Sequence, residues 1–275
     1  MESLVSFSKW LSKWFTVAVI LWAAFNYALP ATSSWVIPNT AYLLGLILFG
    51  MGLTLTTEDF KRIAKRPIPV VLGTVAHYVI MPGLAWLLCM IFHLKGATAA
   101  GVILVGSCPS GTSSSVMAFL SGGDVALDVS IETLSTLLAP LMIPTLLSFL
   151  AGQYVSVPAQ SLFLSTLRIV VVPYYLGGYS FTQSLVRKLM PLSMIMPLIS
   201  QAAILLIVGA VVSANHANIF TAATALVIPV VMLHNLCGYA LGFGFSKILG
   251  LEEPQQKAIT FEVGMQDSSL GATLP

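Results

Sequence analysis

Long apolar runs separated by short polar segments repeat along the whole chain. Eight runs lie near residues 15–30, 40–56, 69–92, 98–120, 126–151, 158–180, 191–213 and 219–245, and a ninth begins near 257. The hydrocarbon core of a bilayer needs about 20 apolar residues per helix. The pattern therefore predicts an all-α polytopic membrane protein.

Polar residues interrupt the fourth run and the ninth. The strings GSCPSGTSSS at 106–115 and FEVGMQDSS at 261–269 both contain a glycine and several hydroxyl-bearing residues. Paired interruptions at corresponding positions are typical of transporters built from inverted repeats, whose discontinuous helices meet near the membrane midplane. Small residues that serve only helix packing could produce the same likeness.

The spacing of the two interruptions suggests a division of the chain into repeats. We expect one transmembrane transporter domain over residues 1–275, with residues 1–151 as the first inverted repeat and 152–275 as the second. The ninth run stops at Pro275 before it could cross the bilayer. We therefore expect the C-terminal part of the second repeat to be absent, because a helix ending within the membrane leaves carbonyl groups unsatisfied.

Charge places the chain relative to the membrane. Only 8% of residues are charged, too few to cover the surface of a soluble domain. When the loops alternate between the two sides, all lysines and arginines except Lys95 and Arg168 fall on one side. The positive-inside rule then places the N-terminus in the cytoplasm. A net charge of +2 indicates no nucleic acid, no obligate protein partner is evident, and we expect membrane lipid around the helices.

Motifs for catalysis and for metal-thiolate chemistry are missing from the sequence. Cys89, Cys108 and Cys237 are isolated, which predicts neither disulfides nor a zinc site. No GxGD, GxSxG or HExxH motif occurs, so we expect no enzyme. A channel or sensor is the remaining alternative to a transporter.

Four carboxylates fall in the predicted fifth run or beside the second interruption. Asp128 and Glu132 are four residues apart in one run, so their side chains emerge on one helix face. Glu262 and Asp267 flank the second interruption. Intramembrane acids are costly and indicate a functional site, although Asp128 could also lie at the interface. Together with serine hydroxyls and backbone carbonyls they form a set of oxygen ligands, which suits a hard cation.

Several motifs resemble those of the bile acid:sodium symporter family, in its bacterial branch. They are FGMGLTL at 49–55, HYVIMP at 77–82, CPSGTSSSVMAFLSGGDVAL at 108–127, STLLAP at 135–140, LHNLCG at 233–238 and FEVGMQDSSLGATL at 261–274. The resemblance implies ten helices in two inverted five-helix repeats, arranged as panel and core domains in the bacterial plasma membrane.

The resemblance also implies an activity. It is sodium-coupled symport of a small organic anion by alternating access, through a cavity between the two domains. Family members take solutes from bile acids and steroid sulfates to pantoate and pyruvate, and no residue of this chain selects among them. A proton-coupled or cation-independent transporter of organic solutes is the alternative.

Carried over by position, the resemblance implies two sodium sites. The first would use Ser114, Ser115, Asp128, Glu132 and Glu262, and the second would use His77, Glu262, Gln266 and the backbone carbonyls of Val263 and Met265.

This chain departs from the family pattern at several of these positions. Ser115, Asp128, Glu132 and Asp267 stand where asparagine, serine, threonine and asparagine are usual, and His77 stands where glutamine is common. Three carboxylates at one site repel unless a cation or a proton lies among them, which leaves one or two sodium ions or a proton as the coupling species. Arg168 is either a counter-charge or a side chain that snorkels to the interface.

Four further residues are candidates for binding the solute. They lie where the second half of each interrupted helix would begin, and they are Thr112, Ser113, Asp267 and Ser268. The positive end of a helix dipole favours an anionic solute there. A negative charge on Asp267 would oppose it.

Overall fold

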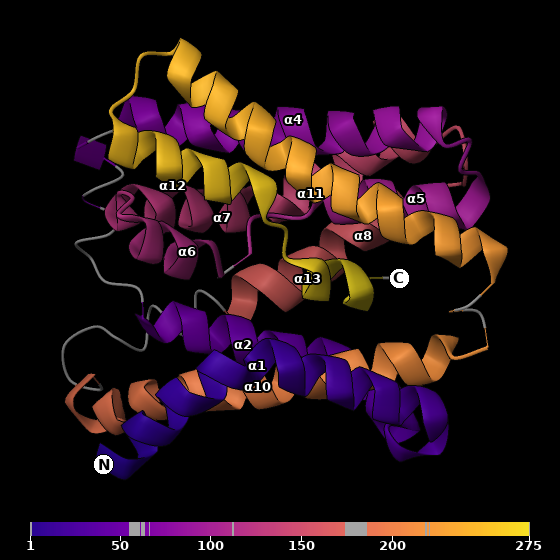
Figure 1. The fold of residues 1–275 in the computed structure, drawn as a ribbon, viewed down its shortest axis with the longest axis horizontal. Coiled ribbons are helices and arrows are strands. Elements are labelled where there is room, and N and C mark those ends of the chain that lie inside the picture. The colour runs from indigo at the N-terminus through magenta and orange to yellow at the C-terminus, as the bar shows by residue number, and fades with distance from the viewer. Residues whose placement is uncertain are drawn as a thin grey trace. The chain divides into compact units, whose positions relative to one another are not determined.

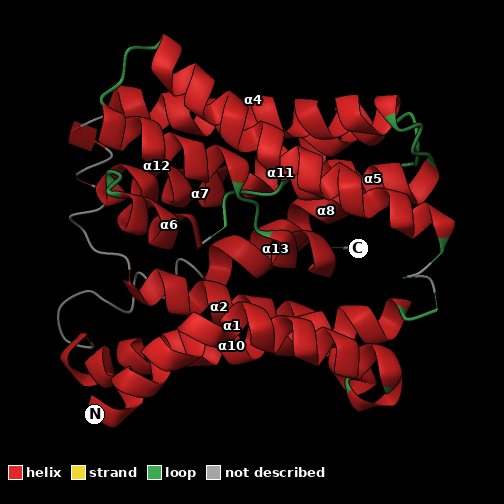
Figure 2. Cartoon of the chain, viewed as in Figure 1, coloured by secondary structure: helices red, strands yellow, loops and turns green. Residues whose placement is uncertain are grey.

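The computed structural model is all-helical over the residues it describes (Figures 1 and 2), which are 2–54, 61, 64, 65, 67–111, 113–173, 186–217, 219 and 221–274. Among these described residues, five helices are long and apolar enough to cross a membrane, as expected of a polytopic membrane protein. Large apolar side chains on the helix surfaces, such as Phe149 at 83% exposure and Tyr42 at 79%, are suited to contact with lipid.

The helices follow the predicted runs closely. In chain order they are α1 (Glu2–Ala28), the 3₁₀ turns η1 (Pro30–Thr32) and η2 (Ser34–Asn39), α2 (Thr40–Thr54), α4 (Pro67–Ile91), α5 (Gly96–Ser107), α6 (Ser113–Ser121), α7 (Val125–Ala151), α8 (Ala159–Thr166), the π-helical η3 (Leu167–Val171), α10 (Val186–Asn215), α11 (Ala222–Ile248), α12 (Glu253–Gly264) and α13 (Ser268–Thr273). The first helix begins much earlier than the predicted run at 15–30.

The chain forms two compact units, and each combines segments from both halves of the sequence. One unit comprises Met1–Thr56 and Arg168–Thr221, in which α10 packs against α1 and α2. A buried amide ties this unit together, because Asn26 Oδ1 accepts hydrogen bonds from the hydroxyls of Thr32 at 3.1 Å and Ser213 at 3.4 Å. The division into repeats at residues 151 and 152 is a different partition and stays a prediction.

The second unit comprises Thr57–Leu167 and Ala222–Pro275 and contains both interrupted helices. In it α4 packs against α5, α7, α11 and α12. Its apolar core includes Met81, Ile131, Ile259 and Val263, all of them fully buried. This core holds α7 against α12, the two helices that carry the predicted intramembrane acids.

The first interruption separates α5 from α6. Cys108 takes an extended conformation (φ −68°, ψ 154°) immediately before Pro109. A residue that precedes proline is disfavoured in the helical region, and this explains where α5 ends. The second interruption, between α12 and α13, is extended at Met265 (φ −110°, ψ 131°).

The two interruptions cross and pair with each other. Ser110 and Gln266 form an isolated antiparallel bridge, in which Gly111 N–H donates to Met265 O at 3.3 Å and Asp267 N–H donates to Pro109 O at 2.9 Å. Backbone groups that leave a helix at membrane depth need partners from within the protein, and each interruption supplies partners for the other. Helix α6 consequently contacts α12, and α13 contacts α5.

A close backbone approach makes Gly111 a sensitive position. A Cβ atom added there would lie 3.0 Å from the carbonyl oxygen of Gln266, which is backbone and cannot rotate away. We predict that Gly111→Ala pushes the two interruptions apart and destabilises the protein by about 1–3 kcal/mol, the usual cost of overpacking. The measurement is thermal unfolding of the purified protein in detergent. Gly101→Ala in α5 is the matched control, because nothing lies within 4 Å of its added Cβ; equal melting temperatures of both variants would contradict the prediction.

Candidate functional site

Two serines in the first turn of α6 face acids from two other helices. Ser114 Oγ lies 3.2 Å from Asp128 Oδ2 on α7 and closer still to Glu262 Oε1 on α12. Ser115 Oγ lies 2.7 Å from Asp128 Oδ2 and 3.2 Å from Glu132 Oε2. A serine hydroxyl carries one proton, so these four contacts share two protons. Two of the contacts therefore bring oxygen atoms together with no serine proton between them.

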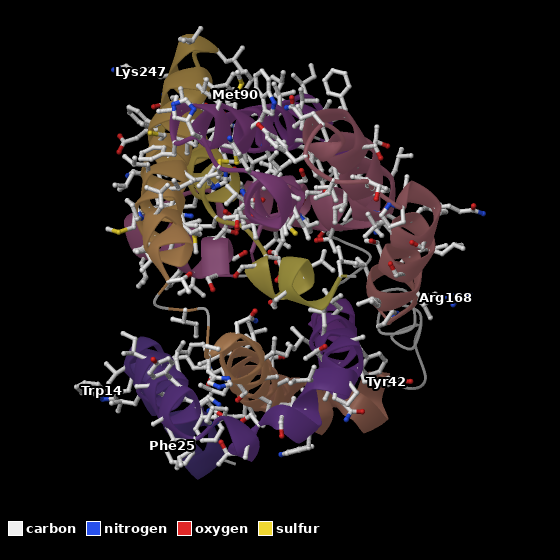
Figure 3. The ribbon with its side chains drawn as sticks, turned by 90° about the vertical axis from the view of Figure 1, so that its right-hand side faces the viewer. Trp14, Phe25, Tyr42, Met90, Arg168 and Lys247 are labelled. Atoms are coloured by element: carbon white, nitrogen blue, oxygen red, sulfur yellow. The ribbon has the colours of Figure 1, made fainter. Side chains whose placement is uncertain are left out.

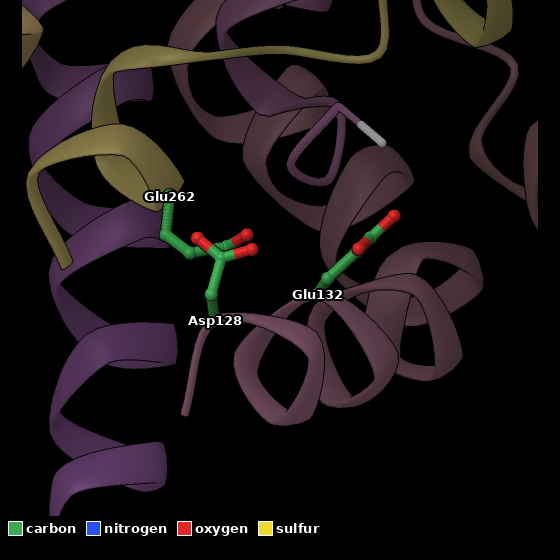
Figure 4. A group of neighbouring side chains, drawn as sticks. All are labelled: Asp128, Glu132 and Glu262. Atoms are coloured by element: carbon green, nitrogen blue, oxygen red, sulfur yellow. The ribbon is translucent and has the colours of Figure 1, made fainter. Parts of the chain in front are cut away.

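Asp128, Glu132 and Glu262 form what we call the acidic cluster. One carboxylate oxygen from each lies within 4.8 Å of the others. Figure 4 shows Asp128 and Glu132 on α7 and Glu262 on α12, with the carboxylates of Asp128 and Glu262 facing each other. Asp128 and Glu262 are fully buried and Glu132 is 7% exposed. The four-residue spacing on α7 and the packing of α12 against that helix together create the cluster.

The acidic cluster has oxygen atoms left over. Asp128 Oδ1, Glu132 Oε1 and Glu262 Oε2 are buried without a hydrogen-bond partner. Within the described part of the chain, the charged neighbours of the three acids include no lysine or arginine. A buried charge without a partner is strongly unfavourable, so the cluster requires a bound cation, added protons, or both.

Arg168 is the basic residue considered from the sequence. Its side chain is exposed (Figure 3), and the residue belongs to the other compact unit. Whether it acts as a counter-charge or reaches toward an interface stays a prediction.

The residues assigned to a second sodium site lie around the end of α12. His77 Nδ1 is 2.8 Å from the carbonyl oxygen of Glu262, and His77 Nε2 is 2.9 Å from that of Cys108. The imidazole therefore lies between the ends of α5 and α12. Both partners are carbonyl oxygens, which accept hydrogen bonds, so a neutral ring donates to only one of them at a time. Gln266 Nε2 donates to Val263 O at 3.2 Å, which leaves Gln266 Oε1 buried and without a partner.

The structure describes three of the four candidate residues for the solute. Ser113 and Ser268 are exposed at the starts of α6 and α13, and Thr112 lies outside the described residues. Asp267 caps α13, where its Oδ1 accepts hydrogen bonds from Ser269 Oγ at 2.6 Å and Leu270 N–H at 3.3 Å. Its carboxylate therefore occupies the helix end that was expected to attract an anion.

Sequence reasoning missed two contributors to this region. The carbonyl of Cys108 contacts His77, and the hydroxyl of Ser110 is buried beside Glu262. Both residues stand in the polar string at 106–115, so that string was the available signal. Their contacts depend on elements distant in the chain.

Comparisons with known proteins identify the family of this chain. The sequence profile of the Sodium Bile acid symporter family matches residues 41–222. The chain is 42% identical over its whole length to the uncharacterized sodium-dependent transporter YocS of Bacillus subtilis, of which it covers 85%. It is 34% identical to the probable sodium/metabolite cotransporter BASS1 of Arabidopsis thaliana chloroplasts, over 99% of this chain and 70% of that protein.

A human protein is also similar to this chain, at lower sequence identity. The ileal sodium/bile acid cotransporter of Homo sapiens is 29% identical over 84% of this chain and 67% of that protein. A transporter family of this kind, matched over most of the chain, is not an enzyme family. The chain therefore belongs to the Sodium Bile acid symporter family.

Proposed function

We propose that this protein is a sodium-coupled symporter that imports a small organic anion across the bacterial plasma membrane by alternating access. The observation that carries the proposal is the buried acidic cluster beside two crossing helix interruptions. Family membership and a relative named as a sodium-dependent transporter support sodium as the coupling ion.

Sodium binding would resolve the unsatisfied groups of the site. The acidic cluster and the hydroxyls of Ser114 and Ser115 offer only oxygen ligands, the kind that hard cations prefer. A cation among them would separate the oxygen atoms that share too few protons. The carbonyls of Val263 and Met265, with Gln266, are the proposed ligands of a second ion.

An organic anion is the proposed solute because relatives named for sodium coupling include a bile acid cotransporter. Ser113, Thr112, Ser268 and Asp267 are the proposed contacts, at the interruptions that inverted-repeat transporters use for binding. We also propose that residues 1–151 and 152–275 correspond to the two repeats. Proton coupling is the second candidate, because protons could equally neutralise the acidic cluster.

The proposal is tested by uptake into proteoliposomes. Labelled cholate, pantoate and pyruvate are offered under an inward sodium gradient, under an inward proton gradient and under neither. Saturable uptake driven by the sodium gradient is the expected result. Uptake of these acids that follows only the proton gradient would favour the second candidate, and flux that does not saturate would indicate a channel.

Removing the charge of Glu262 should abolish the response to sodium. Sodium at about 100 times its dissociation constant stabilises a folded protein by about 2.7 kcal/mol, and we predict that Glu262→Gln loses this stabilisation because Glu262 belongs to both proposed sites. The measurement is melting temperature against NaCl at constant ionic strength. Glu253→Gln is the control, since Glu253 is exposed and pairs with Lys257 at 2.7 Å; a sodium response that persists in Glu262→Gln would contradict the assignment.

Protons and sodium should compete for the acidic cluster. Lower pH protonates carboxylates and so removes the charge that attracts sodium. We predict that the sodium concentration for half-maximal stabilisation rises as pH falls from 8 to about 5. The double change Asp128→Ser and Glu132→Thr should flatten this dependence while sodium binding persists. A sodium response of the parent protein that is the same at every pH would contradict the prediction.

The N-terminus and the segment before α4 are proposed to face the cytoplasm. Helix α4 has 25 residues, about 37 Å at 1.5 Å per residue, which is enough to cross the hydrocarbon core. Lys61 precedes it and Lys95 follows it, and both are exposed. We predict that an impermeant thiol reagent labels Lys95→Cys but not Lys61→Cys in intact cells, in a background lacking Cys237. The opposite labelling would reverse the orientation.

A further inference from the structure

We propose that His234 on α11 is a positioning residue for the second proposed cation site. Through the carbonyl of Met81 it holds the turn of α4 that follows His77. The inference rests on the proposed sodium symport, because it concerns the geometry of one of its cation sites. His234 itself is not among the proposed ligands.

A long-range hydrogen bond fixes His234 in the core of the second unit. The residue is 4% exposed, and its Nε2 atom lies 2.9 Å from the carbonyl oxygen of Met81 on α4. A carbonyl oxygen only accepts hydrogen bonds, so Nε2 carries the proton and donates it. The two residues are 153 positions apart in the chain. The bond therefore ties α11 to the backbone of α4, where an apolar side chain could only pack.

Proline weakens α4 at this point. Pro82 follows Met81 inside the helix; it has no N–H to donate, and its ring clashes with the carbonyl four residues before it, that of Tyr78. A proline inside a membrane helix is tolerated when neighbouring helices stabilise the backbone around it. His234 does so from α11, and Tyr78 Oη donates to the Ser135 carbonyl of α7 at 2.7 Å. This turn of α4 is therefore fixed by bonds to both α7 and α11.

His77 lies directly before this turn. It is four residues before Met81, on the same face of α4. Its ring lies between the carbonyls of Glu262 and Cys108, at 2.8 and 2.9 Å, beside the end of α12 where the second site is proposed. The imidazoles of His77 and His234 are close enough to interact electrostatically. A shift of the turn would therefore move the His77 ring relative to the end of α12.

Helices pack closely around the bond from His234. A Cβ atom added to Gly238, one turn further along α11, would lie 2.6 Å from Met81 Sδ and 3.2 Å from the Cα atom of Gly264. Gly264 is the last residue of α12, between the two residues whose carbonyls are proposed ligands. A Cβ atom on Gly106 of α5 would lie 3.2 Å from His234 Nε2. A change at this bond is therefore transmitted to the end of α12.

The first test compares side chains that keep or remove the donor. In His234→Gln the amide nitrogen can take the place of Nε2, whereas His234→Leu keeps the approximate size and has no donor. Melting temperature is measured against NaCl at constant ionic strength, with the purified full chain in detergent. We expect His234→Leu to raise the sodium concentration for half-maximal stabilisation about fivefold, equivalent to about 1 kcal/mol for one hydrogen bond. His234→Gln should respond like the parent protein.

A control and a substitute variant separate this effect from folding. His216→Leu is the control, because His216 also contacts a carbonyl, that of Ser213 at 2.9 Å, but is exposed in the other unit. If His234→Leu does not fold, His234→Asn replaces it, since the shorter amide does not reach the place of Nε2. A merely structural role would lower the melting temperature without sodium and leave the half-maximal sodium concentration unchanged, and that result would overturn the inference.

A double-mutant cycle asks whether His234 acts through His77. Two changes that act through one residue are not additive. We expect His77→Ala with His234→Leu to need no more sodium than His77→Ala alone. Glu132→Gln with His234→Leu should show the sum of both effects on the free energy of sodium binding, because Glu132 belongs to the first proposed site.

The outcomes distinguish this inference from the proposed symport. Additive effects of His77→Ala and His234→Leu would contradict the inference. A parent protein with no sodium response would overturn the symport and this inference together, whereas a parent response that His234→Leu leaves unshifted would overturn the inference alone.

Discussion

The need to satisfy backbone hydrogen bonds inside a membrane governs this structure more than any other interaction. An interrupted helix exposes N–H and C=O groups where no water can reach them, at a cost of several kcal/mol for each unsatisfied group. Here the interruptions bond to each other, through Gly111 to Met265 and Asp267 to Pro109. The close approach requires a glycine at position 111, because a side chain there would meet the Gln266 carbonyl.

The same crossing assembles the acidic cluster. Pairing of the interruptions brings the first turn of α6 over α7 and α12, and so places Ser114 and Ser115 against acids from both helices. Asp128 and Glu132 are close because of helical periodicity, whereas Glu262 joins them only through the packing of α12. Every residue of the cluster belongs to one compact unit. The proposed ion site can therefore be described from the geometry of that unit alone.

Asp267 and His77 each hydrogen-bond to backbone groups at a helix end, where a solute or an ion could otherwise bind. The carboxylate of Asp267 satisfies the N-terminal turn of α13 from within the chain. The ring of His77 joins the last turns of α5 and α12 through the carbonyls of Cys108 and Glu262. Both contacts lie where the sequence suggested binding of a solute or an ion, and both give these residues a structural part as well.

The sequence by itself determined the class of protein, the positions of the helices and the two interruptions, because apolar runs and polar strings are local signals that a bilayer makes decisive. Helical spacing also placed Asp128 and Glu132 on one face. Only the tertiary structure decided that Glu262 completes the cluster, that Ser110 and the Cys108 carbonyl lie in this region, and that Asp267 caps its own helix. Glu262 is more than 100 positions from Asp128 and from Ser110, and the contacts of Cys108 and Asp267 depend on the backbone path through an interruption. Contacts of these two kinds produce no periodic pattern in the sequence.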